Sequence, residues 1–416
     1  MNLRRFRLPA TTSYDLSLLA VVLALLAIGL AMVYSASGIK ALDTLDDPRH
    51  FLVQQSIWAV IGLAALAVTA RLDYHRYRAL ALPLLAITVV LLVVVLVPGV
   101  GTRAGGASRW LRAGFVGLQP GELAKLALLL YLAFWLGARG KTVGRAGVTL
   151  PFALLVALVA GLVVAEPDLG TATVIVGIAL AMYFVAGARL LEFAALGTLA
   201  AVAVASLAVV QPYRLQRLLT FVDPWSDPRG AGFQTIQALY GLALGGPFGE
   251  GLGAGKEKFG YLPAPYTDSI FAILGNELGL VGTLGVILLF LALAYKGLRI
   301  ALRAPDRAGA LVATGVTVWL AMQAWVNMAV VASLVPLTGI TLPFISYGGS
   351  SLVVGCAAVG ILLNVGRQGA AELPRAPRGR RHRRPRAAAA RGRGGAARAR
   401  PGHAAPVRGW ASRPRG

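Results

Sequence analysis

Long runs of apolar residues recur along this chain, and shorter polar segments separate them. Ten of these runs have about 20 residues each, which is enough for a helix to cross the hydrocarbon core of a bilayer. They lie at residues 15–36, 51–70, 78–97, 119–137, 147–165, 169–186, 189–209, 269–296, 308–333 and 346–366. Inside a bilayer every backbone polar group must be paired, so isolated runs of this kind form α-helices. The pattern predicts an all-α, polytopic integral membrane protein with about ten transmembrane helices.

The first run follows Arg4, Arg5 and Arg7 and resembles a signal peptide with a cleavage site at Ser35–Ser37. It is longer than the apolar part of a signal peptide, and an even number of spans requires it. We therefore interpret it as a helix. The predicted organisation is a cytoplasmic N-terminus at 1–14, a transmembrane domain at 15–366 and a tail at 367–416.

Basic residues concentrate in alternate connections between the runs. This set comprises Arg4, Arg5, Arg7, Arg71, Arg76, Arg78, Arg139, Lys141, Arg145, Arg189, Lys296, Arg299, Arg303 and Arg307. The other connections carry Asp43, Asp46, Asp47, Glu166, Asp168, Asp223 and Asp227 beside fewer bases. Because Lys and Arg favour the cytoplasmic side of a membrane, both termini are predicted to be cytoplasmic.

One connection is much longer than the rest. Residues 210–268 form a predicted extracytoplasmic loop between the seventh and eighth helices, rich in glycine, proline and aromatic residues. Loops of this length in compact proteins are usually functional or disordered, and the aromatic content favours an ordered loop lying on the membrane surface. Two shorter loops on the same side, 98–118 and 334–345, are also rich in Gly, Pro and polar residues. The outer face is therefore the predicted working face.

Composition agrees with a membrane protein. The chain is 57% hydrophobic and 14% charged, against roughly 25% charged residues in soluble domains. The formal net charge of +23 first suggests a nucleic-acid partner, but 15 of the 40 Lys and Arg residues lie in the tail at 367–416. That tail has no hydrophobic period and is predicted to be disordered; it is interpreted as a solvated segment or as one attracted to anionic lipids. No nucleic acid is predicted as a partner.

Asp268 is the first candidate for chemistry, where the long loop enters the eighth helix. An Asp at a helix start commonly caps the first turn. A carboxylate at the membrane boundary can instead act as a general base toward a sugar hydroxyl. Position alone leaves both interpretations open.

Glu122 and Lys125 are three residues apart, hence neighbours on the fourth helix. Charges within a span are costly and usually paired. They either neutralise each other or line a polar cavity that faces a substrate.

A set of basic residues lies on the predicted outer side, against the usual charge rule: Arg103, Arg109, Arg112, Arg214, Arg217, Lys256 and Lys258. Each alone is compatible with a solvated charge. Together they suit an anion such as a diphosphate.

Two other patterns carry no function. Gly253–Lys256 resembles the end of a phosphate loop, but Glu250 and Glu257 occupy positions where such a loop needs Gly and Ser or Thr. The four histidines have no metal-ligand spacing, so no protein metal site is predicted.

Asp268, Glu122, Lys125, Arg109 and Arg214 lie within longer strings that resemble the SEDS family (shape, elongation, division and sporulation), especially its division members. The strings are Tyr34–Ser37, Ala107–Trp110, Gln119–Lys125, Glu166–Thr171, Pro212–Arg214, Asp223–Trp225, Gly232–Gln234, Leu262–Pro263, Thr267–Asp268, Glu277–Gly279 and Thr341–Ser351. They follow the family order and cover roughly residues 15–366.

The resemblance implies a peptidoglycan glycosyltransferase that polymerises lipid II outside the cytoplasmic membrane, together with a class B penicillin-binding protein and other divisome proteins at the septum. It places the family's catalytic Asp on Asp268 and the Glu and Lys of its fourth helix on Glu122 and Lys125. Three departures concern auxiliary proton handling: Ala264 for a usual Glu, Tyr266 for a usual His and Asn276 for the first of two usual Glu.

The implied reaction joins undecaprenyl-diphosphate-linked glycan, the donor, to the 4-hydroxyl of lipid II, with inversion to a β-1,4 linkage. Asp268 takes the proton, and the candidate diphosphate ligands are Arg109, Arg214, Arg217, Lys256 and Lys258, with Glu122 and Lys125 beside the substrate. No nucleotide cofactor is needed; a divalent cation, Mg²⁺ or Mn²⁺, on the diphosphate is compatible. Three alternatives remain: an elongation-type member with the same chemistry, a lipid II flippase and a non-enzymatic scaffold.

Overall fold

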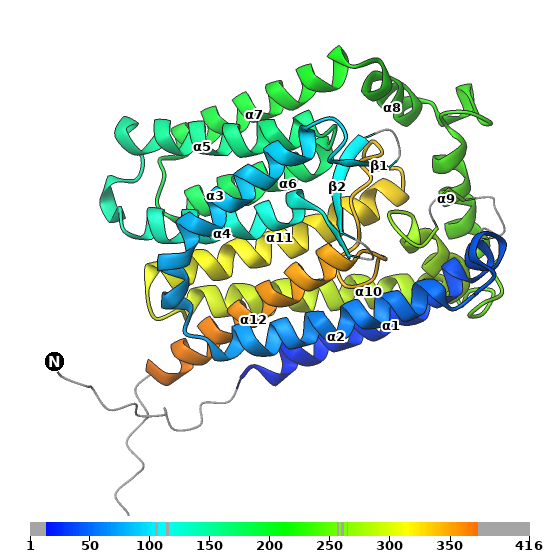
Figure 1. Cartoon of the computed structure of the whole chain (residues 1–416), viewed down its shortest axis with the longest axis horizontal. Coiled ribbons are helices and arrows are strands. Elements are labelled where there is room, and N and C mark those ends of the chain that lie inside the picture. The colour runs from blue at the N-terminus through cyan, green and yellow to red at the C-terminus, as the bar shows by residue number, and fades with distance from the viewer. Residues whose placement is uncertain are drawn as a thin grey trace, which may run out of the picture. The chain divides into compact units, whose positions relative to one another are not determined.

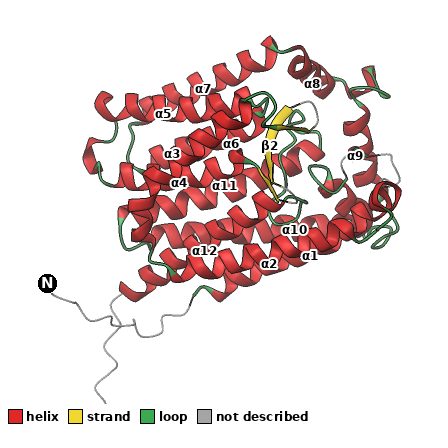
Figure 2. Cartoon of the chain, in the orientation of Figure 1, coloured by secondary structure: helices red, strands yellow, loops and turns green. Residues whose placement is uncertain are grey.

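The computed structural model describes residues 14–104, 107–113, 116–255, 258, 262–263 and 265–372. The described chain is predominantly helical, with one small sheet (Figures 1 and 2). The apolar helices are α1 (Leu16–Leu45), α2 (His50–Arg71), α3 (Tyr77–Leu96), α4 (Pro120–Gly137), α5 (Ala146–Ala165), α6 (Leu169–Val185), α7 (Leu190–Val210), α10 (Ile270–Leu302), α11 (Arg307–Val331) and α12 (Gly349–Glu372).

These helices confirm the predicted all-α, polytopic architecture. Within the described residues, nine are long and apolar enough to cross a membrane, and α6 with 17 residues is slightly shorter. The ten predicted runs coincide with them, but α1 continues nine residues past the predicted end and α12 continues to Glu372. The extension of α12 is anchored, since Arg367 Nη1 donates to Tyr14 Oη at 2.9 Å.

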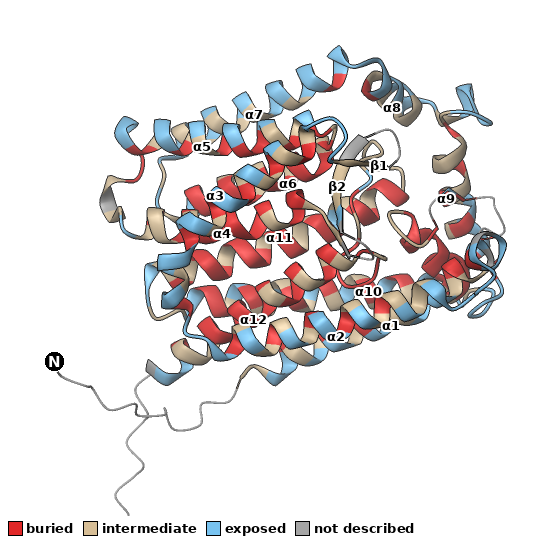
Figure 3. Cartoon of the chain, in the orientation of Figure 1, coloured by how far each residue is buried: buried red, intermediate tan, exposed pale blue. Residues whose placement is uncertain are grey.

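The bundle has a buried centre and an exposed edge. Most of α4, α11 and α12 is buried, whereas Ala208 is the only described residue of α7 that is buried (Figure 3). Small residues allow close helix packing: an added Cβ at Gly360 of α12 would lie 2.4 Å from Leu66 O of α2. Such close approach is the usual means of packing helices in a bilayer, where lipid supplies no hydrophobic driving force between them.

The connections at one end of the bundle are structured. They include the three-stranded antiparallel sheet β1 (Thr102–Ala104), β2 (Ala107–Ala113) and β3 (Val116–Leu118), in that order. The long connection between α7 and α10 contains α8 (Pro212–Val222), the 3₁₀ helix η3 (Pro224–Ser226) and α9 (Phe233–Leu244). Short 3₁₀ helices η1 (Tyr74–Arg76) and η2 (Gly140–Thr142) lie in two of the other connections. We call the end with β1–β3, α8 and α9 the loop-rich end; it is the end predicted to be extracytoplasmic.

Helix α10 is interrupted at Gly279, which has φ of 65° and ψ of −161°. The interruption separates an outer segment, residues 270–278, from the remainder of the helix. Every residue from Ile270 to Glu277 is buried. The loop that precedes this buried segment carries Asp268, so the segment fixes where that carboxylate lies.

Candidate functional site at the loop-rich end

Asp268 precedes α10, whose N-cap is Ser269. Its carboxylate accepts hydrogen bonds from Thr267 Oγ1 at 3.1 Å and Gln234 Nε2 at 3.5 Å. Its backbone carbonyl accepts from Asn327 Nδ2 at 2.8 Å. Burial raises the pKa of Asp268 above its ordinary value, and the Thr267 and Gln234 hydrogen bonds and the Arg217 charge oppose that rise. A carboxylate with a raised pKa is a better proton acceptor near neutral pH than a solvated one.

Asp268 lines a narrow space near two larger cavities. Gln234 and Leu337 also line this space, and Leu337 is shared with a cavity of about 170 Å³. Tyr213 and Arg217 line that cavity, which we call the Arg217 cavity. Thr267, which precedes Asp268 in the chain and donates to its carboxylate, lines a larger cavity of about 570 Å³. The carboxylate thus adjoins the Arg217 cavity through Leu337 and the larger cavity through Thr267.

The larger space, which we call the aromatic cavity, combines ring faces with polar groups. Its lining residues are His50, Phe51, Gln54, Trp58, Trp110, Arg112, Gly117, Tyr266, Thr267, Tyr347, Gly348 and Gly349. The Phe51 and Tyr266 rings are 4.7 Å apart and tilted by 31°, and Tyr347 meets both edge-on. Tyr347 Oη donates to Gln54 Oε1 at 2.5 Å. Tyr266, where the family usually has His, is therefore part of this aromatic wall. Flat apolar faces beside hydrogen-bonding groups suit a sugar ring.

The candidate cations are not gathered in one cluster. Arg217 lies with its guanidinium 4.7 Å from the Tyr213 ring centre and donates to Leu337 O at 3.1 Å. Arg112 lines the aromatic cavity. Lys256 and the side chain of Arg103 lie outside the described residues. Arg217 and Arg112 are thus the described members of the set that line cavities beside Asp268.

The other three cations have protein partners. Arg109 donates to Glu166 O at 3.1 Å and to Pro167 O, and so holds the turn between α5 and α6. Arg214 is buried and donates to Val164 O and Leu207 O, both at 3.3 Å. Lys258 is buried and pairs with Glu277 at 2.8 Å. Their roles toward a diphosphate remain predictions.

Glu122 and Lys125 form a buried ion pair of 2.6 Å. Lys125 Nζ also donates to Gln323 Oε1 of α11 at 2.7 Å, and Gln323 Nε2 donates to Thr341 O at 3.0 Å. The pair therefore connects α4 and α11 to the loop before α12. Neither residue lines the aromatic cavity or the Arg217 cavity.

Sequence reasoning gave no role to two residues that hold Asp268. Asn327 Nδ2 donates to both Asp268 O and Ile340 O, at 2.8 and 2.7 Å, and joins α11 to two loops. The available signal was a polar amide within an apolar run, which is costly unless paired. Gln234 belonged to one of the family strings, but nothing in the sequence placed it beside Asp268.

A divalent cation would find few protein ligands at these cavities. Among the described residues that line these three spaces, Asp268 is the only carboxylate, and it lines the narrow one. Among the described residues, no three His, Cys, Asp or Glu side chains are grouped as metal ligands. Since Mg²⁺ and Mn²⁺ take oxygen ligands and Mg²⁺ is often held by one carboxylate together with substrate phosphates, the residues fit a cation carried by a diphosphate.

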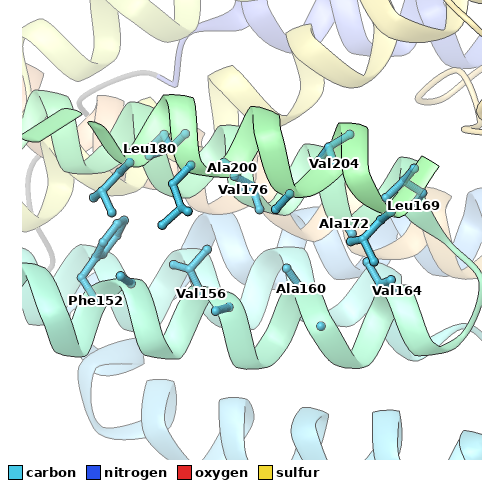
Figure 4. Close-up of a pocket in the computed structure, with 17 residues that line it drawn as sticks. Phe152, Val156, Ala160, Val164, Leu169, Ala172, Val176, Leu180, Ala200 and Val204 are labelled. Carbon is cyan, nitrogen blue, oxygen red and sulfur yellow. The ribbon is translucent and has the colours of Figure 1, made fainter. Parts of the chain in front are cut away.

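A separate apolar cavity of about 440 Å³ lies between α5, α6 and α7 (Figure 4). Its walls are hydrocarbon side chains, including Phe152, Val156, Val176 and Val204. Leu207 and Val164 line it as well, and their carbonyls are the acceptors for Arg214. Arg214 therefore ties α8, which also carries Arg217, to this cavity.

Together, fold and site define a polytopic membrane protein with a candidate reactive carboxylate beside cavities at one end of the helical bundle. The model of the family described as cell cycle protein, which comprises FtsW, RodA and SpoVE, matches residues 15–370. The chain belongs to this family, as the sequence strings predicted.

Several relatives are similar over most of the chain. Stage V sporulation protein E of Bacillus subtilis is 45% identical, over 86% of this chain and 98% of that protein. A protein of Thioalkalivibrio sulfidiphilus named probable peptidoglycan glycosyltransferase FtsW is 46% identical, over 85% of this chain and 90% of that protein.

Solved structures are also similar. A chain of a peptidoglycan synthase complex, from work on the structural coordination of polymerization and crosslinking, has a TM-score of 0.71 at 34% identity and covers 86% of this chain and 98% of that one. The rod shape determining protein RodA of Thermus thermophilus has a TM-score of 0.64 at 30% identity, with coverage of 86% and 97%.

Proposed function

We propose that this chain is a peptidoglycan glycosyltransferase that polymerises lipid II into β-1,4-linked glycan strands at the outer face of the bacterial cytoplasmic membrane. The observation that carries the proposal is that Asp268 lines a space adjoining the Arg217 cavity, while its neighbour Thr267 lines the aromatic cavity. Relatives named probable peptidoglycan glycosyltransferase FtsW, 40–46% identical, support the same activity.

In the proposed reaction, Asp268 accepts the proton of the 4-hydroxyl of the acceptor GlcNAc. The hydroxyl oxygen attacks the anomeric carbon of the donor, and the bond from that carbon to the diphosphate breaks. Undecaprenyl diphosphate leaves with the bonding electron pair, and the α-linked donor becomes a β-linked product. The Arg217 guanidinium supports the negative charge that develops on the leaving group.

The aromatic cavity, the Arg217 cavity and the apolar cavity match the sugar, diphosphate and polyprenyl parts of such a substrate. Sugar rings fit the aromatic cavity, and the diphosphate fits beside Arg217. The polyprenyl chain fits the apolar cavity between α5, α6 and α7, whose wall is joined to α8 through Arg214 (Figure 4). If a divalent cation accompanies the diphosphate, Asp268 is the carboxylate that would hold it, and the cation would supply positive charge toward the leaving group.

A lipid II flippase needs a polar path across the bilayer. The charged residues buried within described spans are paired instead: Glu122 with Lys125, and Glu277 with Lys258. A septal role with both termini cytoplasmic is supported by the FtsW relatives and by the distribution of basic residues. An elongation-type role would use the same chemistry. A class B penicillin-binding protein is the proposed partner, supported by the similar chain from a peptidoglycan synthase complex.

One experiment separates an enzyme from a flippase. The purified chain with its transpeptidase partner is given lipid II in detergent, where no membrane exists to cross, and glycan is measured on a gel. Glycan formation supports the enzyme. Lipid II translocation in vesicles without any glycan in detergent would overturn the proposal.

A further inference from the structure

A buried polar cluster joins three parts of the chain near the interruption in α10. Glu277 of α10 and Lys258 of the long loop form an ion pair of 2.8 Å. Ser35 Oγ of α1 lies 2.6 and 2.7 Å from the two oxygens of Glu277 and donates to them. Lys258 Nζ also donates to Ser35 Oγ at 3.2 Å. Glu277 is 0% exposed and Lys258 7%, so water does not replace these partners.

Residues 246–251 of the long loop form backbone hydrogen bonds with α10 at its interruption. In a continuous helix, the carbonyls of Asn276 and Glu277 would accept from residues 280 and 281. Here they accept from the backbone N–H groups of Glu250 and Gly251, both at 3.0 Å. The freed N–H groups of Leu280 and Val281 donate instead to Gly246 O at 2.9 Å and Pro247 O at 3.1 Å. The loop therefore supplies hydrogen-bond partners for these four backbone groups.

Glycines make this insertion sterically feasible. Gly279 has positive φ, and a Cβ added there would lie 2.3 Å from Gly249 N. A Cβ on Gly249 would lie 2.1 Å from Glu277 O. The outer segment 270–278 is consequently a separate short helix whose orientation is not dictated by the rest of α10. Contacts with other parts of the chain must therefore fix the orientation of this segment.

We infer that the Ser35–Lys258–Glu277 cluster is a positioning device for Asp268. It holds the end of the outer segment against α1 and the long loop, while Asp268 lies two residues before the start of the same nine-residue segment. Buried ion pairs are weak contributors to stability, because apolar replacements are often as stable. Their geometric precision matters more, since a displacement of roughly 1 Å at a catalytic group can cost about 10²-fold in rate.

This inference gives Lys258 a role different from that of a diphosphate ligand. A ligand would contribute to substrate binding, so its loss would raise KM. A positioning residue acts through Asp268, so its loss lowers kcat and leaves KM unchanged. Glu277 helps to distinguish the positioning role from the ligand role, because a carboxylate does not attract a diphosphate and its loss should not weaken diphosphate binding.

The test compares Lys258→Met, Glu277→Gln and the double variant Lys258→Met with Glu277→Met, in the full chain with its transpeptidase partner. The single variants strand a buried group and are expected to lose both thermal stability and rate. The double variant is expected to regain stability but to keep a kcat about 10–100-fold below wild type, with KM unchanged. Recovery of both stability and kcat would reduce the cluster to a structural role. A raised KM in Lys258→Met alone would favour a diphosphate ligand.

A matched pair of milder changes lies on α1. Ser35→Ala removes one hydrogen-bonding group from the cluster, whereas Ser37→Ala removes a buried hydroxyl that has no hydrogen-bond partner in the described part of the chain. Ser35→Ala is expected to lower kcat several-fold and Ser37→Ala to leave it unchanged. Equal effects of the two changes would contradict the inference.

The kinetic readout rests on the proposed function, so a second readout is independent of activity. In a Cys356→Ala background, Asp268→Cys carries the only thiol of the chain. Its rate of reaction with a small hydrophilic thiol reagent is measured with the cluster intact and with the double Met change. Faster labelling in the latter supports positioning even if wild type makes no glycan. Equal rates would overturn it, whatever the fate of the proposed function.

Discussion

Replacing Asp268 by Asn separates its chemistry from its structural contacts. Asn keeps the size of Asp and can still accept a hydrogen bond from Thr267 Oγ1, now 3.1 Å away. The Asn327 hydrogen bond goes to the backbone carbonyl and is unaffected. Gln234 Nε2, 3.5 Å from the carboxylate, can donate to the amide oxygen of Asn as well. The fold should therefore survive, with a thermal midpoint close to that of wild type.

The rate should not survive. An amide cannot accept the acceptor's proton, and loss of a general base costs about 10²–10⁴-fold. That factor corresponds to about 2.7–5.4 kcal/mol of transition-state stabilisation. Asp268→Glu should also be slow, because its extra methylene displaces the carboxylate by about 1 Å from the position that Thr267 and Gln234 define.

The assay is lipid II polymerisation by purified complexes of wild type, Asp268→Asn and Asp268→Glu, with thermal unfolding and partner binding measured on the same samples. Stable, partner-bound Asp268→Asn protein that makes almost no glycan is the expected result. Near-normal glycan synthesis by this variant would refute the general-base role and leave only a structural one.

Three further predictions concern other parts of the chain. Burial raises the pKa of Glu166 to about 8, so the folded protein keeps a proton that the unfolded chain loses at lower pH, and stability should fall between about pH 4.5 and 8; Glu166→Gln should flatten that fall in thermal unfolding, and an unchanged pH profile would contradict it. Glu122→Ala strands the buried Lys125 charge, so it should lower the thermal midpoint more than the double change Glu122→Ala with Lys125→Ala does. A double variant that polymerises lipid II as poorly as the worse single variant would instead indicate a role toward substrate. In a Cys356→Ala background, Ser226→Cys in the long loop should react with an impermeant reagent in intact cells; reaction only after permeabilisation would mean the opposite topology.

The helices could be predicted from the sequence because each corresponds to one contiguous apolar run long enough to cross a bilayer. The interruption of α10 could not, because the sequence shows only a glycine within an apolar run. What breaks the helix is the backbone of residues 246–251, which supplies partners for the freed groups. The β1–β3 sheet was missed because its strands are short: β1 and β3 have three residues each, too few for a local alternating pattern.

The candidate site also has one part that the sequence predicts and another that only the tertiary structure shows. Asp268 was identified by its place at a helix start and by a family string, which are both sequence features. The neighbours that hold it, Gln234 and Asn327, lie 34 and 59 residues away in the chain. Lys258 was grouped with the basic residues of the predicted outer side because it lies in the long loop, whereas its partner Glu277 is on α10 and Ser35 on α1. Pairings of this kind depend on tertiary packing that no local pattern records.

The physics of the bilayer explains why the site lies at the end of the bundle. A carboxylate that must ionise is costly within hydrocarbon, yet a solvated one has too low a pKa to take a proton efficiently near neutrality. A loop residue packed under α9 and α11 meets both requirements, because burial raises the pKa of Asp268 without placing it within a span. The substrate imposes the same boundary, since its lipid must stay among helices while its sugars remain outside. α8 connects two of the cavities. Arg214 ties it to the apolar cavity, and Arg217 lines the cavity that adjoins the space beside Asp268. A shift of α8 would therefore move the wall of the apolar cavity and the Arg217 side chain together relative to Asp268.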